Sequence, residues 1–307
     1  MEYKILKILS SEWGISERRI RQLIEEGRIQ GATKVGKSWL IPNDVKKPRD
    51  TRLAVKPSKF VINLPDNLTG IDEKFALLNS KRPFPPATIK SIKSHELIEW
   101  TYNSNGIEGN TLTLKETKVV LEGITIGGKS VKEHLEAINH KEAILYLEEL
   151  VGKNSVLSER DIKSIHQLVL KEIDQENAGR YRIEKVIISG ATHIPPDHIF
   201  VSEQMEQLML DIKIWTKQYH PLVVSALLHG EFVKIHPFVD GNGRTARLLM
   251  NFIAMKNGFP PLIIRKEQRL EYYDALDNAH ITKDYTAFVQ LIISAAEKSL
   301  DYYLSLV

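Results

Sequence analysis

The sequence predicts a mainly α-helical protein with a small domain of different composition at its N-terminus. From Ala87 onward, apolar residues recur at the three- and four-residue spacing of amphipathic helices. Residues 158–161 form a capping box before one such run, and residues 223–229 are apolar enough for a buried helix. Residues 1–59 contain fourteen lysines and arginines and seven acidic residues, whereas the rest has 28 basic and 32 acidic residues. This asymmetry indicates separate partners for a basic head and a helical body.

The head, residues 1–52, is predicted to contain two short helices followed by a hairpin. The first helix begins at Ile5, Ser16 caps the second, and residues 33–42 form the hairpin. Residues 16–42 resemble a small winged helix-turn-helix domain of the MerR and excisionase type. The resemblance implies a helix in the major groove of DNA and wing lysines on phosphates, although such modules also bind proteins. The candidate DNA contacts are Ser16, Arg18, Arg19, Gln22, Lys34 and Lys37.

Composition places the chain among ordinary globular proteins. Residues 53–86, rich in proline and lysine, are predicted to connect the head to a second domain, residues 87–307. No apolar stretch approaches the roughly 20 residues of a membrane helix, and no secretory signal is present, so we expect no membrane partner. The sequence has no cysteine, which excludes disulfides and thiolate nucleophiles and fits a cytoplasmic location.

Residues 123–130 match the phosphate-binding pattern G-x-x-x-x-G-K-[ST], with Lys129 as its lysine. That loop functions only between a buried strand and a helix of a parallel sheet. The preceding residues 114–122 are predicted to be helical, and no series of hydrophobic strands accompanies them. We therefore interpret the segment as a connection between two helices, with Lys129 and Ser130 at the start of the second.

Residues 236–247, His-Pro-Phe-Val-Asp-Gly-Asn-Gly-Arg-Thr-Ala-Arg, are the most informative segment. They combine a titratable base, a carboxylate of the kind Mg²⁺ prefers and two arginines. Pro237 and the glycines predict a loop, and a helix is predicted from Arg244. Backbone N–H groups before a helix start point toward a bound anion. The segment therefore favours a phosphate-containing nucleotide and a nucleophile that must lose its proton.

This segment resembles the signature of the Fic family, His-Pro-Phe-x-(Asp/Glu)-Gly-Asn-Gly-Arg-x-x-Arg, at every specified position. Fic proteins have an all-helical fold and transfer a nucleotide monophosphate, usually AMP from ATP with Mg²⁺, to a protein hydroxyl. The resemblance implies that His236 is the general base on a Ser, Thr or Tyr hydroxyl and that Asp240 holds Mg²⁺. It also implies that Gly241, Asn242 and Gly243 form an anion hole for the α-phosphate. Arg244 and Arg247 would bind the β- and γ-phosphates.

Residues 104–110, Ser-Asn-Gly-Ile-Glu-Gly-Asn, match the inhibitory motif of the same family, (Ser/Thr)-x-x-x-Glu-(Gly/Asn). The resemblance implies that Glu108 pairs with Arg247 and repels the γ-phosphate. Bound ATP would then hold its α-phosphate out of position for attack. The alternative is an exposed glutamate at a helix end.

Two further segments resemble parts of a Fic site. Residues 186–196 contain a β-branched run, a glycine and a proline pair, which predict a short hairpin. It resembles the Fic flap, whose edge pairs with the target's backbone. The flap candidates are Ser189, Gly190, Ala191, Thr192 and His193. Candidates for the adenine and ribose pocket are Tyr272, Tyr273 and His280; many family members have asparagine in place of the last, and the tyrosines could equally be ordinary helix-packing residues.

The sequence thus predicts an autoinhibited protein adenylyltransferase whose partners are ATP with Mg²⁺, a target protein or the chain itself, and DNA or a protein at the head. One alternative is a DNA-binding regulator whose nucleotide site senses ATP without chemistry. Another is an enzyme that removes AMP from a modified protein, with Glu108 orienting the water. UTP or GTP as donor, and a homodimer, stay open.

Overall fold

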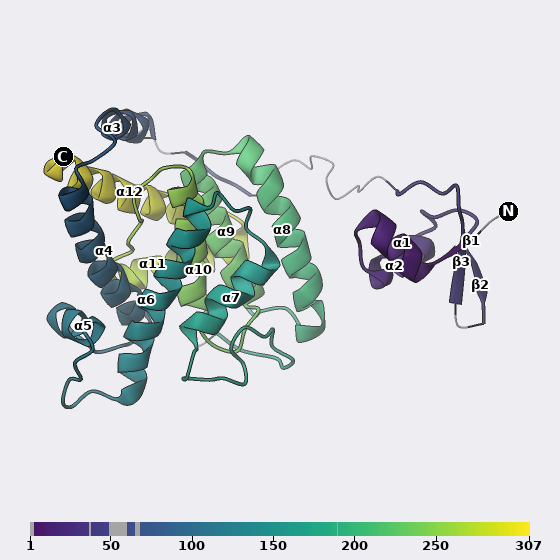
Figure 1. Cartoon of the computed structure of the whole chain (residues 1–307), viewed down its shortest axis with the longest axis horizontal. Coiled ribbons are helices and arrows are strands. Elements are labelled where there is room, and N and C mark those ends of the chain that lie inside the picture. Colours follow the sequence, from purple (N-terminus) through teal and green to yellow (C-terminus); the bar gives the residue numbers. More distant parts are fainter. Residues whose placement is uncertain (1–2, 37, 49–59, 65–67, 189) are drawn as a thin grey trace. The chain divides into compact units, whose positions relative to one another are not determined.

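The computed structural model describes residues 3–36, 38–48, 60–64, 68–188 and 190–307. The chain separates into two compact units, Met1–Val55 and Lys56–Val307, which are described separately (Figure 1). The larger unit is built almost wholly of helices, so the predicted mainly α-helical class is confirmed. Among the described residues, every helix is too short or too polar to span a bilayer.

Among its described residues, the head contains two helices and a three-stranded antiparallel sheet with the strand order β1-β3-β2. Its elements are β1 (Tyr3–Ile5), α1 (Leu6–Trp13), α2 (Glu17–Glu25), β2 (Thr33–Val35) and β3 (Ser38–Pro42). Strand β1 was not predicted: Ile5 pairs with Leu40 of β3 instead of starting the first helix. Ser16 caps α2 as predicted, because its side chain accepts a hydrogen bond from the Arg19 N–H at 3.2 Å.

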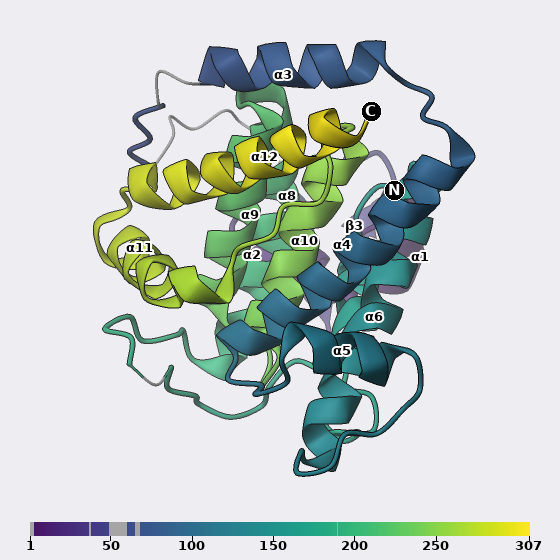
Figure 2. The same cartoon turned by 90° about the vertical axis from the view of Figure 1, so that its left-hand side faces the viewer.

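The larger unit has ten α-helices and two short 3₁₀ helices among its described residues. These are α3 (Leu68–Ser80), α4 (Pro86–Ile107), α5 (Leu114–Leu121), α6 (Val131–Gly152), α7 (Glu159–Val169), η2 (His198–Phe200), α8 (Val201–Gln218), α9 (Pro221–Ile235), α10 (Asn242–Lys256), η3 (Lys266–Gln268), α11 (Arg269–Thr282) and α12 (Thr286–Leu306). Figure 2 shows α10 in the middle of this unit, where it packs against α9, α6, α7 and α4.

Helix α9 forms the centre of the core together with α10. It is buried without interruption from Leu222 to Gly230, because it is apolar around almost its whole circumference. This confirms the buried helix predicted at residues 223–229. Gly230 permits a close approach, since a Cβ atom there would lie 2.4 Å from the ring of Tyr285.

Side-chain caps fix the starts of the helices that lead to the site. Thr113, Ser130 and Ser158 each form a capping box with the acidic residue three positions later. The P-loop-like segment lies between α5 and α6, as its interpretation as a helix-to-helix connection requires. Lys129 of that segment donates a hydrogen bond to the Thr111 carbonyl oxygen at 2.7 Å, so it serves the local fold.

The stretch predicted to connect the two domains contains helix α3. This helix packs against α12, and its Ile71 and Leu78 are fully buried. Lys74 on α3 also pairs with Glu297 and Asp301 of α12. Two apolar positions seven residues apart lie on one helical face. This spacing indicates a helix, but the proline-rich composition of the stretch favoured the prediction of a connector.

Candidate active site

The site is centred on the loop between α9 and α10. His236 ends α9 in the left-handed conformation (φ 49°, ψ 59°), and its N–H donates to the Phe232 carbonyl oxygen at 3.0 Å. Asn242 closes the loop, because its side chain accepts from the Phe238 N–H and donates to the Phe238 carbonyl oxygen. This bracing lets α10 begin at Asn242, two residues earlier than predicted.

The imidazole of His236 has the properties of a neutral base. Burial lowers the pKa of His236 to about 4, so the ring is uncharged at pH 7. Its Nδ1 is buried and has no hydrogen-bond partner within the described part of the chain. The side chain also lines an open cavity of about 540 Å³. A neutral imidazole in such a cavity can accept a proton from a hydroxyl.

The start of α10 forms the floor of an anion site. Gly241 adopts a left-handed conformation (φ 75°) that directs the chain into the helix, and the positive end of the helix dipole lies here. Glu108 occupies this position. A Cβ atom on Gly243 would lie only 2.4 Å from Glu108 Oε1, so the glycine leaves room for the carboxylate.

The predicted pair between Glu108 and Arg247 is formed. Glu108 is the C-cap residue of α4, and its Oε1 lies 2.7 Å from Arg247 Nη2. The buried guanidinium also donates to the hydroxyl and the carbonyl oxygen of Ser104, at 3.0 and 2.8 Å, and to the Tyr272 hydroxyl at 3.3 Å. Each of the three guanidinium nitrogens of Arg247 thus has a partner within the chain.

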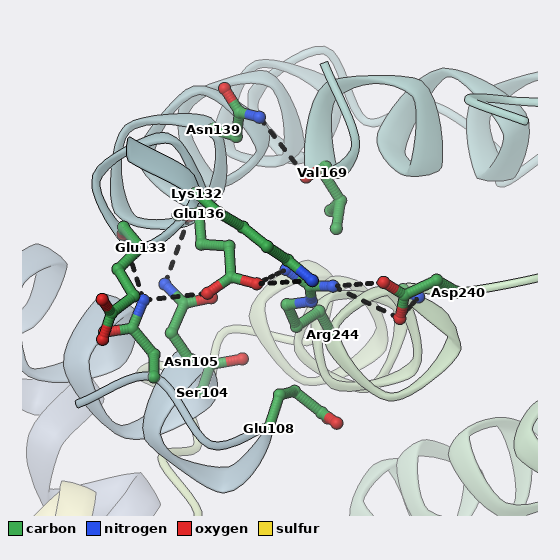
Figure 3. A network of polar contacts seen from close by, with 12 residues as sticks. Ser104, Asn105, Glu108, Lys132, Glu133, Glu136, Asn139, Val169, Asp240 and Arg244 are labelled. Carbon is green, nitrogen blue, oxygen red and sulfur yellow. Dashed lines mark hydrogen bonds and ion pairs between the residues drawn. The ribbon is translucent and has the colours of Figure 1, made fainter. Parts of the chain in front are cut away.

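Arg244 points toward two acidic residues, Glu136 and Asp240 (Figure 3). Its Nη2 lies 3.5 Å from both carboxylate oxygens of Asp240, and its Nη1 lies 3.3 Å from Glu136 Oε1 on α6. Glu136 was not predicted as a site residue, because a glutamate in an amphipathic helix is usually a solvated charge. The polar neighbours Asn139 and His140, which are buried on the same helix, were the available signal.

A second residue missed from the sequence is His166 on α7. Its Nδ1 accepts from the Gly179 N–H at 2.9 Å, and its Nε2 lies 2.8 Å from the Asp240 carbonyl oxygen. The ring stacks on Phe238 with centroids 3.6 Å apart. Phe238 is fully buried, as expected for a residue that fixes the loop. His166 therefore stabilises the loop between α9 and α10, although it lies on α7, far from that loop in the sequence.

The flap segment reaches the same cavity without forming the predicted hairpin. Among its described residues, 186–188 and 190–196, no strand is present. Instead, the Thr192 and His193 N–H groups both donate to the Asp277 carboxylate at 3.0 Å, which satisfies backbone donors that a hairpin would have paired. Gly190 and Ala191 line the cavity with His236, and the remaining flap candidate, Ser189, lies outside the described residues.

The three candidates for the adenine and ribose pocket all line this cavity. The Tyr272 hydroxyl lies 3.0 Å from His229 Nε2, and His280 Nε2 lies 2.9 Å from the Gly230 carbonyl oxygen. Tyr273 donates to the Ile107 carbonyl oxygen and is 38% exposed. Both tyrosine hydroxyls and His280 Nε2 thus have partners within the protein, and the ring faces line the cavity.

The residues at Asp240 fit a magnesium ion that arrives with a nucleotide. Its carboxylate is 53% exposed and borders Arg244. Among the described residues, no group of three or more His, Cys, Asp and Glu side chains could hold a metal ion. Mg²⁺ typically binds one or two carboxylates and completes its shell with phosphate oxygens and water, which matches a single exposed aspartate.

Comparisons with known proteins relate this geometry to one group. Residues 156–254 match the model of the Fic/DOC family. "Protein adenylyltransferase Fic" of Aedes aegypti is 39% identical over 70% of this chain and 43% of that protein. The corresponding protein of Nematostella vectensis is 38% identical over 78% of this chain and 56% of that protein. The chain spans about half the length of these curated relatives.

Solved structures of Fic proteins are also similar to this chain. Fic-1 (aa134–508) from C. elegans is 33% identical, with a TM-score of 0.70 over 78% of this chain and 71% of that one. A Fic domain containing signaling protein from Bacteroides thetaiotaomicron is 27% identical, with a TM-score of 0.70 over 78% of this chain and 96% of that one.

Proposed function

Because this chain belongs to the Fic family, we propose that it is a protein adenylyltransferase, which transfers AMP from ATP to a Ser, Thr or Tyr hydroxyl of another protein or of the chain itself. One observation carries the proposal. A neutral, buried imidazole, that of His236, lines the same cavity as Gly243 at the start of α10. A general base and an anion site are thus directed at one space.

In the proposed reaction the acceptor oxygen attacks the α-phosphorus of ATP, and its proton passes to His236. The bond from the α-phosphorus to the oxygen that bridges to the β-phosphate breaks, and pyrophosphate leaves. The N–H groups of Asn242 and Gly243 stabilise the negative charge that develops on the α-phosphate, whereas the Gly241 N–H donates to Asp240 Oδ1 at 2.6 Å. Asp240 would hold the Mg²⁺ that accompanies ATP, and this ion would neutralise phosphate charge. Arg244 and Arg247 bind the outer phosphates.

We further propose that Glu108 inhibits this reaction. Its carboxylate lies on the anion site and neutralises the guanidinium of Arg247 at 2.7 Å. A γ-phosphate cannot contact Arg247 in this arrangement without displacing the carboxylate, and the two anions repel each other. ATP that binds elsewhere in the cavity holds its α-phosphate away from His236.

The reverse reaction is a second candidate. Glu108 is 30% exposed and lines the cavity together with His236. A carboxylate in that position can orient a water molecule toward the phosphorus of an AMP-modified hydroxyl. Release of AMP when the wild-type protein is incubated with modified target would support removal over transfer.

For the head we propose binding to DNA or to a protein partner. Arg18 and Lys34 are exposed, and the Lys34 amino group lies 6.0 Å from the centroid of the Trp39 ring. Arg19, in contrast, donates to Gln22 at 2.7 Å and pairs with Glu26, which weakens its candidacy. Lys37 lies outside the described residues. An ATP-dependent DNA footprint without covalent transfer by any variant would favour the alternative of an ATP-sensing regulator.

The test of the enzymatic proposal is labelling with α-phosphate-labelled ATP. The Glu108→Gly variant should incorporate label into protein, and adding His236→Ala should abolish it. His95→Ala in the same background is the matched control, because His95 is exposed and does not line the cavity. Equal labelling with and without His236 would refute the catalytic assignment. Intact-mass analysis with ATP, UTP and GTP would identify the donor.

A further inference from the structure

We propose that Glu136 is a positioning residue for Arg244: it holds the guanidinium beside the phosphate site and keeps it from closing onto Asp240. The inference rests on the proposed function of this site as an ATP site. It assigns a role to a side chain on α6 that belongs neither to the signature loop nor to the inhibitory motif.

The guanidinium of Arg244 lies between two carboxylates of unequal environment (Figure 3). Glu136 is 10% exposed and lies 3.3 Å from Nη1, whereas Asp240 is 53% exposed and lies 3.5 Å from Nη2. The Arg244 side chain itself is 3% exposed. Attraction between charges is stronger where water is excluded, so Glu136 is the principal counter-charge of this buried cation.

Glu136 is itself held from behind. Asn110 Nδ2 donates to Glu136 Oε2 at 2.9 Å, and Asn105 Nδ2 donates to the Glu136 carbonyl oxygen at 3.2 Å. These contacts fix one carboxylate oxygen and leave Oε1 toward Arg244. Lys132 is a minor partner, because its amino group is 4.0 Å away and its side chain is 61% exposed.

Arg244 retains donors for a phosphate in this arrangement. Its Nε and Nη1 are buried without a hydrogen-bond partner in the described part of the chain, although Nη1 is within ion-pair distance of Glu136. Buried N–H donors normally have partners, so an acceptor is missing here. If Glu136 lost its charge, the nearest remaining acid would be Asp240. Closure of Arg244 onto that carboxylate would compete with the metal ion expected there.

The turn that carries Glu108 and Asn110 is therefore linked to both arginines. Glu108 binds Arg247 directly, and Asn110 reaches Arg244 through Glu136. A displacement of this turn would alter both phosphate ligands.

The experiment uses the full chain in the Glu108→Gly background and measures the Kd of ATP by equilibrium dialysis, up to millimolar ligand, with and without Mg²⁺. Glu136→Gln should weaken binding of Mg²⁺-ATP about tenfold and raise the Mg²⁺ concentration needed for half-maximal binding, as changes behind a metal ligand do. Metal-free ATP should be affected less. In an Arg244→Gln background the same change should have no further effect.

Glu142→Gln is the matched control, because Glu142 lies on the same helix and pairs at the surface with Lys171. Unchanged or tighter Mg²⁺-ATP binding by Glu136→Gln would overturn the proposal, and so would an equal loss in the Arg244→Gln background. Should Glu136→Gln fail to fold, Asn110→Ala is the second variant. It keeps the negative charge of Glu136 but removes the hydrogen bond that holds the Glu136 carboxylate in place. It should weaken Mg²⁺-ATP binding in the same direction, and an unchanged Kd would likewise overturn the proposal. Failure of Glu108→Gly to transfer AMP would count against the enzymatic function alone, because the binding measurements need no turnover.

Discussion

Replacing Glu108 provides a quantitative test of the inhibitory pair. Glu108→Gln keeps the shape of the side chain but removes the charge that neutralises Arg247 at 2.7 Å. A hydrogen bond to a charged group contributes about 1.5–3 kcal/mol. Loss of that free energy would increase the fraction of molecules in which Arg247 is free to bind the γ-phosphate by about 10- to 150-fold. We expect AMP transfer to rise about tenfold in Glu108→Gln and further, toward a hundredfold, in Glu108→Gly.

The same pair stabilises the fold, so activation should lower stability. Removing one partner of a fully buried pair costs about 3–5 kcal/mol. Glu108 is 30% exposed and Arg247 keeps its bonds to Ser104 and Tyr272, so we expect a smaller loss of about 2 kcal/mol. For a domain of this size that lowers Tm by about 4–8 °C. ATP should restore more of the Tm in the variant than in the wild type, because its γ-phosphate replaces the lost anion.

The assay combines initial rates of label incorporation from α-phosphate-labelled ATP with thermal melts in the presence and absence of Mg²⁺-ATP. An increase in rate without any loss of Tm would mean that the pair does not restrain Arg247. Equal rates for the wild type and both variants, with equal stabilisation by ATP, would refute the inhibitory role of Glu108.

Three further predictions concern the same site. In the Glu108→Gly background, His236→Ala should abolish transfer but leave the Kd of ATP within about twofold, because a general base does not bind the ground-state nucleotide; a dialysis measurement showing lost ATP binding would contradict this role. Because burial lowers the pKa of His236 to about 4, the base is already neutral at pH 6, so kcat/KM of Glu108→Gly should be level from pH 6 to 8 and fall as the pH drops toward 4. A rise of about fourfold between pH 6 and 8 in the pH–rate profile would show that the imidazole titrates near its ordinary pKa of about 6.5. Finally, Lys129→Ala should leave the Kd of ATP unchanged within about twofold, because the Lys129 amino group donates to Thr111 and the residue does not line the cavity. Loss of ATP binding in a folded variant would instead support the P-loop interpretation.

The parts of the site that local sequence determines were predictable. The loop before α10 follows from Pro237 and the glycines, because each restricts or frees the backbone at its own position. The caps at Ser16 and Ser158 follow from their own side chains and residues three positions away. The pairing of Glu108 with Arg247 required the family pattern, since 139 residues separate the two.

The missed features depend on contacts between distant segments. Glu136 and His166 look like ordinary residues of amphipathic helices, and only the packing of α6 and α7 against α10 brings them to the loop. The flap contains strand-forming residues, yet Asp277 of α11 binds its backbone and replaces a hairpin partner. Strand β1 likewise exists only because β3 lies beside it. Propensity is a weak guide where such tertiary contacts decide the conformation.

The lack of a side chain at Gly243 affects how this chain could escape its own restraint by mutation. Because Gly243 has only a hydrogen atom in place of a side chain, the space beside it is filled by the Glu108 carboxylate. In the proposed reaction the phosphate needs the same space. A methyl group there would expel the carboxylate but also crowd the nucleotide, so a change at this position would remove the restraint together with the activity. Unrestrained yet active forms should therefore arise by substitution of the glutamate itself or of the turn that carries it, which a selection for gain of activity in randomly mutated genes would reveal.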